Sequence, residues 1–144
     1  MLWDRISSRL RRVHSDFGTT RWTMRTGTVL EQGEIVLIPI PFTDLSSQKR
    51  RPVIVVSNSD YHRRTCDMLV VAMTSNPAKI DYGFKIDTID LERGQLNHPG
   101  TIRVDRIYTM SQSLIVTKFG KVNEATLERI RTVLAHLVSR KAHI

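Results

Sequence analysis

The chain has a single cysteine, Cys66, among its 144 residues, so it cannot form an intramolecular disulfide. No group of cysteine and histidine residues has the spacing of a zinc site. The longest apolar runs, 35–40 and 68–73, are far shorter than the roughly 20 residues that a membrane-spanning helix needs. These absences argue against a disulfide scaffold, a zinc module and an integral membrane protein, and they favour a reducing, cytoplasmic setting.

Acidic residues are also in short supply. The 14 aspartates and glutamates face 22 lysines and arginines, which gives a formal net charge of +8 and a pI near 10.3. Such a surface attracts polyanions, so nucleic acid is the leading partner, although charge alone confers neither specificity nor chemistry. A merely solvated basic surface remains the alternative. The ordinary share of hydrophobic residues, 40%, and the length predict one globular domain with a real core.

The first residues differ in composition from the rest. Residues 1–25 contain six arginines and two aspartates, and apolar residues at steps of three and four over 2–14 would suit a basic amphipathic helix. A transit peptide, a flexible extension, or an upstream start codon with translation beginning at Met24 would each explain this segment. We favour the last two together, and we expect a basic extension over 1–29 and the folded domain over 30–144.

From Gly33 onward, short runs rich in β-branched residues alternate with turn residues, which is typical of a small barrel or sandwich. A polar connection, 58–67, separates two of these runs. After Asn123, a plausible N-cap, apolar residues with helical spacing predict a helix that ends near Arg140 and closes the core. The fold class is therefore α+β and mainly β. The predicted strands are 33–38, 52–57, 68–74, 101–110 and 114–119, with a weaker alternation over 80–91.

Four blocks, taken in order and with their spacing, resemble the toxins of the MazF/PemK family. They are Gly33–Val36, Lys49–Ser57, Leu69–Ser75 and Thr101–Thr109. The likeness covers roughly residues 30–140. It implies a small SH3-like β-barrel with a C-terminal helix, shared with the CcdB toxins, and a symmetric homodimer with RNA along a basic groove at its interface.

The resemblance also implies an activity. It indicates a sequence-specific endoribonuclease that cuts single-stranded RNA without a metal or any other cofactor and leaves a 2′,3′-cyclic phosphate and a 5′-hydroxyl. The two catalytic positions correspond to Arg51, which precedes a proline, and Thr74, which ends the third strand. These residue types suit the chemistry, because a ribose 2′-hydroxyl is its own nucleophile and a guanidinium can stabilise the charge that develops on phosphorus.

Further residues are expected to contact RNA. They lie in the loop before Arg51, directly after Thr74, and in the polar connection 58–67. A cognate antitoxin with an acidic segment is the second partner that the resemblance implies, and the net charge suits it. The expected RNA-binding residues are Gln48, Lys49, Arg50, Arg63, Arg64 and Ser75.

Several alternatives remain open on the residues alone. Arg51 could be a structural cation that caps the loop before Pro52, and Thr74 an ordinary strand-end threonine. His62 and His98 invite comparison with ribonucleases that use a histidine acid and base, because histidine titrates near neutrality. At the level of function, a gyrase-inhibiting toxin of the CcdB type and a non-catalytic RNA-binding module of the same fold are the rivals.

Overall fold

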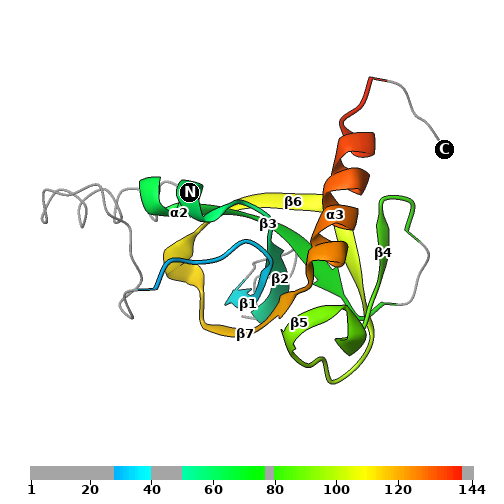
Figure 1. The fold of residues 1–144 in the computed structure, drawn as a ribbon, viewed down its shortest axis with the longest axis horizontal. Coiled ribbons are helices and arrows are strands. Elements are labelled where there is room, and N and C mark those ends of the chain that lie inside the picture. The colour runs from blue at the N-terminus through cyan, green and yellow to red at the C-terminus, as the bar shows by residue number, and fades with distance from the viewer. Residues whose placement is uncertain (1–27, 40–49, 77–79, 141–144) are drawn as a thin grey trace, which may run out of the picture.

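The computed structural model describes residues 28–39, 50–76 and 80–140. Within these ranges the chain forms strands, two α-helices and two 3-10 turns (Figure 1). The elements are β1 (Glu34–Pro39), β2 (Arg50–Val55), α2 (Ser59–Arg64), β3 (Asp67–Thr74), β4 (Gly83–Ile86), η1 (Thr88–Asp90), β5 (Leu91–Gly94), β6 (Gly100–Ser111), η2 (Gln112–Leu114), β7 (Thr117–Val122) and α3 (Glu124–Leu137).

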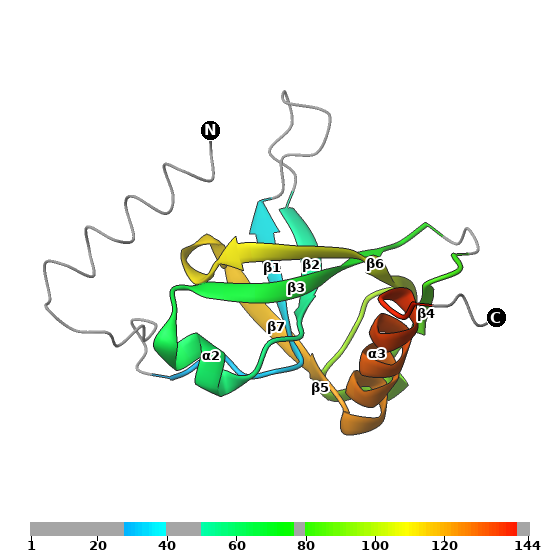
Figure 2. The same ribbon diagram turned by 90° about the horizontal axis from the view of Figure 1, so that it is seen from above.

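The strands form one antiparallel sheet of seven strands in the order β4-β6-β3-β2-β1-β7-β5. The sheet curls strongly, and Figures 1 and 2 show α2 and α3 near opposite ends of it. Register shifts in the β1–β7 and β3–β6 ladders add to the curvature, because a bulge bends the strand that carries it. The expected class, mainly β with a C-terminal helix, is confirmed as a curled half-barrel.

Both faces of the central strands are apolar, because successive side chains of a strand point to opposite faces. Ile35, Ile54 and Val71 belong to one buried cluster, which α3 covers through Leu127 and Ile130. The residues that adjoin them in the sequence belong to a second cluster on the other face of the sheet, which we call the second core. Its buried members are Leu30, Val36, Ile38, Val53, Val55, Met68, Val70 and Met110.

Helix α3 begins where the sequence predicts. The side chain of Asn123 accepts a hydrogen bond from the backbone N–H of Thr126 at 2.9 Å, which satisfies one of the donors left without a partner at a helix start. Thr126 in turn donates its hydroxyl to the carbonyl of Asp90, so the start of the helix is tied to η1. His136, near the other end, is exposed.

The polar connection expected over 58–67 joins β2 and β3 and contains helix α2. Asn58 caps this helix by accepting the N–H of Tyr61 at 2.9 Å. This polar segment is helical because one of its residues, His62, is fully buried and holds the helix against the rest of the fold. Six residues are too few to show a hydrophobic period, so the pattern had no helical signature.

The last strand is shifted from its expected position of 114–119 to Thr117–Val122. The chain first turns through η2, where the side-chain nitrogen of Gln112 donates to the carbonyls of His62, Thr65 and Asp67. These bonds satisfy backbone carbonyls around the end of α2 and hold the chain in η2, so β7 begins later than expected.

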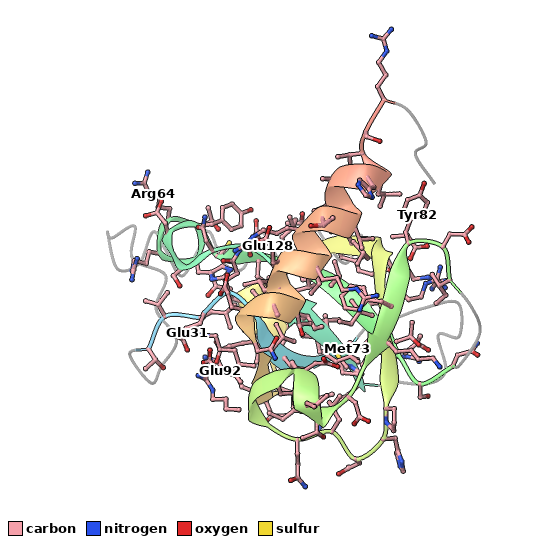
Figure 3. The ribbon with its side chains drawn as sticks, turned by 45° about the vertical axis from the view of Figure 1, so that its right-hand side comes forward. Glu31, Arg64, Met73, Tyr82, Glu92 and Glu128 are labelled. Carbon is pink, nitrogen blue, oxygen red and sulfur yellow. The ribbon has the colours of Figure 1, made fainter. Side chains whose placement is uncertain are left out.

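A charged network joins β1, β5 and β7 around the start of β1. The buried carboxylate of Glu34 on β1 lies 3.2 Å from Arg93 of β5 and 3.5 Å from Lys118 of β7. Figure 3 shows Glu31 and Glu92 at the same end of the sheet, and Lys121 pairs with both. The network compensates the burial of Glu34 and ties the edge strand β5 to the centre.

Most of the expected extension 1–29 lies outside the described residues, as does the loop 40–49. None of the helices in the described ranges is long and apolar enough to cross a membrane.

Candidate active site at the open end of the sheet

Arg51 and Thr74 lie on neighbouring strands and on the same face of the sheet. The β2–β3 ladder ends at the pair of Val53 and Ala72, and Arg51 and Thr74 lie two residues beyond that pair on each strand, so alternation directs both to the same face. On its other side Arg51 pairs with Ile38 of β1. The face that carries the second core thus becomes polar at this end of the sheet.

The hydroxyl of Thr74 is held in a defined orientation. Its oxygen accepts the backbone N–H of Asn76 at 3.1 Å, in a turn directly after β3. Thr101 of β6 pairs with Thr74 in the β3–β6 ladder, and its hydroxyl donates to the carbonyl of Asn76 at 3.5 Å. Because the oxygen of Thr74 already accepts a hydrogen bond, its O–H is well placed to donate one to a ligand.

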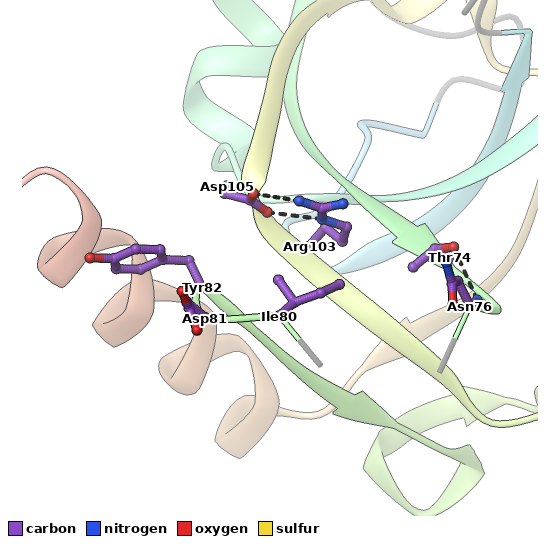
Figure 4. A pocket seen from close by; sticks show the side chains of 7 residues that line it. All are labelled: Thr74, Asn76, Ile80, Asp81, Tyr82, Arg103 and Asp105. Carbon is purple, nitrogen blue, oxygen red and sulfur yellow. Dashed lines mark hydrogen bonds and ion pairs between the residues drawn. The ribbon is translucent and has the colours of Figure 1, made fainter. Parts of the chain in front are cut away.

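A pocket of about 380 Å³ opens beside Thr74 (Figure 4). Its volume lies within the usual range for small-molecule sites. Strand β6 and the segment before β4 form the wall opposite Thr74, and most of the lining side chains are polar. The lining residues are Thr74, Asn76, Ile80, Asp81, Tyr82, Arg103 and Asp105.

Gly83 allows the two strands that form this wall to come close. It pairs with Arg103, and a Cβ at this position would lie only 2.4 Å from the carbonyl oxygen of Ile102. Any other residue would therefore push β4 away from β6 and change the wall of the pocket.

The pocket holds an arginine–carboxylate pair and, beside it, the carboxylate of Asp81. The Nε and Nη2 groups of Arg103 donate to the two carboxylate oxygens of Asp105 at 3.1 and 2.6 Å. These hydrogen bonds lower the pKa of Asp105 and raise the pKa of Arg103, so both groups are charged at neutral pH. A fork-to-fork pair of this kind fixes the plane of the guanidinium.

The structure brings together only part of the expected site. Ser75 is exposed and follows Thr74 directly, whereas Arg50 is exposed and, by strand alternation, points to the opposite face from Arg51. Gln48 and Lys49 lie outside the described residues.

Arg63 and Arg64 lie far from the pocket. They belong to α2, which precedes β3, whereas Thr74 ends β3, so the eight residues of that strand separate them by about 23 Å. Figure 3 shows Arg64 and the pocket residue Tyr82 on opposite sides of the molecule. Arg64 pairs with Asp60 at 3.1 Å on the exposed surface of its own helix.

Neither of the two histidines considered as an acid–base pair lines the pocket. His98 is exposed in the loop before β6. His62 is fully buried next to the second core, where its Nδ1 lies 2.7 Å from the carbonyl oxygen of Leu30 and its Nε2 2.6 Å from the hydroxyl of Ser57. Because His62 has no solvent access and both ring nitrogens have partners inside the fold, its role is structural.

Sequence reasoning missed Arg103, Asp105 and the segment from Ile80 to Tyr82. One signal was present, since Thr101, Arg103 and Asp105 alternate along a predicted strand and so share a face. The pairing partner of that strand was not readable from the sequence, and only the register shows that this face meets Thr74. Among the described residues, no group of three histidine, cysteine, aspartate or glutamate side chains could hold a metal ion.

Comparison with known proteins identifies the family. The family model described as "PemK-like, MazF-like toxin of type II toxin-antitoxin system" matches residues 31–138, which is most of the chain. The chain belongs to this toxin family. The resemblance of the four sequence blocks is thereby confirmed, and no curated protein matches the sequence significantly.

Solved structures share the fold of this MazF-like toxin. An endoribonuclease from mycobacterial species has a TM-score of 0.59 and 24% identity, over 75% of this chain and 89% of its own. A mycobacterial endoribonuclease in complex with its cognate antitoxin has a TM-score of 0.60 and 20% identity, over 78% and 97%. A MazE–MazF complex from Deinococcus radiodurans has a TM-score of 0.62 and 20% identity, over 77% and 97%.

Proposed function

We propose that this MazF-like toxin is a sequence-specific endoribonuclease that cuts single-stranded RNA without a metal ion. The observation that carries the proposal is that Arg51 and Thr74 lie on neighbouring strands and on one face, next to a polar pocket that Thr74 lines. The names of the structural neighbours, which are endoribonucleases, support it. The cut leaves a 2′,3′-cyclic phosphate and a 5′-hydroxyl.

The reaction needs little from the protein beyond placement and charge. The 2′-oxygen forms a bond to phosphorus, the bond from phosphorus to the 5′-oxygen breaks, and a proton moves from the first oxygen to the second overall. A guanidinium has five N–H donors and no acceptor, so Arg51 can donate hydrogen bonds but cannot serve as the base. We assign it to the negative charge that develops on the phosphorane.

Thr74 has a complementary role. Because Asn76 already donates to its oxygen, the hydroxyl donates toward a phosphate oxygen, and Ser75 and nearby backbone N–H groups add further donors. Removing one such donor commonly costs a factor of about 100 to 1000 in rate.

Two protein partners belong to this proposal. The first is a second copy of the chain, because the family resemblance implies a homodimer with the RNA groove at its interface. The second is a cognate antitoxin, since the structural neighbours include an endoribonuclease in complex with its cognate antitoxin and a MazE–MazF complex. An acidic antitoxin segment would complement the net charge of +8 and occlude the groove.

The test uses the full chain and a long unstructured RNA in the presence of EDTA, with mapping of cut sites and end groups. We expect site-specific cuts with cyclic-phosphate ends, and losses of about 100-fold or more in Arg51→Ala and Thr74→Ala. Arg140→Ala and Thr132→Ala, which change the same residue types on the exposed surface near and on α3, are the matched controls.

A substrate with a single 2′-deoxyribose at the cut site tests the nucleophile directly. That substrate must stay intact at its modified position and still be cut at its other sites. Cuts that persist in Arg51→Ala would keep the function and refute the mechanism, and an intact RNA with the unmodified protein would refute the function.

A further inference from the structure

One acidic side chain of the pocket has no part in the proposed reaction. Arg103 and Asp105 are paired with each other, whereas no described residue forms a hydrogen bond or an ion pair with the carboxylate of Asp81. Asp81 is exposed and lines the same pocket as Thr74 (Figure 4). The pocket therefore contains a charged acceptor that is available to a ligand.

A carboxylate at this place does not suit the phosphates of the RNA backbone. Like charges repel, so Asp81 opposes the attraction that the net charge of +8 exerts on a phosphate. An ionised carboxylate has two acceptor oxygens and no donor. It suits a neutral group with N–H donors, and the unstacked bases of single-stranded RNA are such groups.

The backbone around Asp81 is held by the sheet. The carbonyl of the next residue, Tyr82, accepts the N–H of Val104 at 3.0 Å, and the β4–β6 ladder starts at Gly83. On the other side, the Cγ2 of Ile80 lies 3.2 Å from the position that a Cβ on Gly83 would have. Asp81 therefore belongs to a fixed wall, next to an aliphatic side chain against which a flat base can pack.

We propose that Asp81 selects guanine at one of the two nucleotides that flank the cut. This inference rests on the proposed function and adds to it the identity of one base. Thr74, which that function assigns to the scissile phosphate, lines the same pocket, so a base in this pocket belongs to a nucleotide next to that phosphate. Guanine presents two adjacent donors, N1–H and the N2 amino group, and each carboxylate oxygen accepts one of them.

The other three bases match the carboxylate less well. On their Watson–Crick edges, adenine and cytosine place an acceptor nitrogen next to the amino group, and uracil places a carbonyl on each side of its N–H. Each of these bases sets an acceptor against a carboxylate oxygen, which leaves that oxygen without a donor and costs affinity. Two matched hydrogen bonds to a base discriminate it from the others by roughly 10- to 100-fold.

The first experiment maps the cut motif of the full chain and of its variants on a pool of RNAs with randomised sequence. We expect guanine beside the cut for the unmodified protein, and no preference at that position for Asp81→Ala, with the rest of the motif unchanged. Asp81→Asn presents one acceptor and one donor, which match adenine or cytosine, so the preferred base should change rather than disappear. The matched control, Asp60→Asn, removes an exposed carboxylate on α2 and should leave the motif unchanged.

The second experiment removes a single group from the substrate. An RNA with guanine beside the cut is compared with the same RNA carrying inosine, which lacks only the N2 amino group. We expect inosine to lower kcat/KM severalfold for the unmodified protein and to have no effect on Asp81→Ala, as in a double-mutant cycle between groups in contact. Equal losses in the two proteins would overturn the contact with Asp81.

An effect of charge alone gives a different result. If Asp81 only repels RNA, Asp81→Ala and Asp81→Asn should both speed the cutting of every RNA, most strongly at low salt, without a change of motif. An unchanged motif in both variants therefore overturns the proposal. A motif of the unmodified protein that has no guanine beside the cut overturns it as well.

The two proposals fail in different ways. A protein that cuts RNA and needs Arg51, but whose motif does not depend on Asp81, keeps the nuclease and overturns the base contact. If no RNA is cut, the nuclease is overturned, and binding of 2′-deoxy-substituted RNAs with guanine or inosine then tests the base contact. Weaker binding of inosine by the unmodified protein, but not by Asp81→Ala, keeps the contact, whereas equal binding by the unmodified protein overturns it. Circular dichroism checks that the variants of this exposed residue are folded.

Discussion

The buried histidine provides the clearest quantitative prediction about stability. The carbonyl of Leu30 can only accept a hydrogen bond, so the Nδ1 of His62, at 2.7 Å, carries the proton. Nε2 then accepts the hydroxyl of Ser57 at 2.6 Å, and the Ser57 oxygen accepts the N–H of Leu69 at 2.8 Å. This chain of bonds is complete only with a neutral imidazole.

The pKa of His62 is lowered chiefly by burial, against the opposing effects of the hydrogen bond to Leu30 and of the nearby Glu34; Lys118 lowers it further. Because the folded pKa lies below the unfolded value of about 6.5, the unfolded state takes up the proton first as the pH falls. The contribution of His62 to the free energy of unfolding is therefore complete above about pH 6.5. Below that pH it decreases, by at most about 1.4 kcal/mol per pH unit.

The assay is urea unfolding at a series of pH values between 8 and 5, with His62→Gln as the perturbation. Glutamine can donate and accept hydrogen bonds but does not titrate in this range. We expect this variant to lose about 1–3 kcal/mol at pH 7.5, where imperfect bonds replace good ones. Below pH 6.5 its stability should depend less steeply on pH than that of the unmodified protein.

The pH window isolates this histidine from the acidic groups. The carboxyl pKa values of Glu31 and Asp105, lowered by their hydrogen bonds to Arg93 and Arg103, affect stability only as the pH falls below about 4.5. His98→Gln and His136→Gln change exposed side chains and should leave the steep part of the curve intact. An identical pH dependence with and without His62 would refute the reasoning.

Two further predictions concern stability. Asn123→Ala removes the cap of α3 and should cost about 1 kcal/mol by urea unfolding, whereas Asn123→Ser should cost less, and equal stability of the two variants would contradict the capping role. Gly83→Ala places a Cβ 2.4 Å from the carbonyl oxygen of Ile102, so it should destabilise the protein by more than 1 kcal/mol, and a change within 0.5 kcal/mol, as expected for exposed Lys85→Ala, would contradict the close approach.

The central strands and α3 were predictable because their patterns are long and regular. The β-branched runs around Val53 and Val71 are buried on both faces and therefore show as continuous apolar stretches. The start of helix α3 is marked by the N-cap residue Asn123, and apolar residues recur along the helix at helical spacing. Helix α2 was not predictable, since what makes it helical is the burial of His62 against distant residues.

The candidate site was predictable only in part, and for a different reason. The choice of Arg51 and Thr74 came from a family resemblance, whereas their placement on one face of neighbouring strands comes from the register of β2 and β3. Arg103 was out of reach, because only the pairing of β3 with β6 shows that its face meets Thr74. Periodicity along one strand does not say which strand it pairs with.

The position of the site follows from the way side chains diminish along one face of β3. Met68 and Val70 fill the second core, Ala72 follows with a single methyl group, and Thr74 presents a hydroxyl. The same face of the neighbouring strand β2 passes from Val53 to Arg51. The core therefore ends where the polar pocket begins, and the pocket rests on strands that the core holds in register. Substrate charge can then be met by donors on a rigid sheet, which need little reorganisation during the reaction.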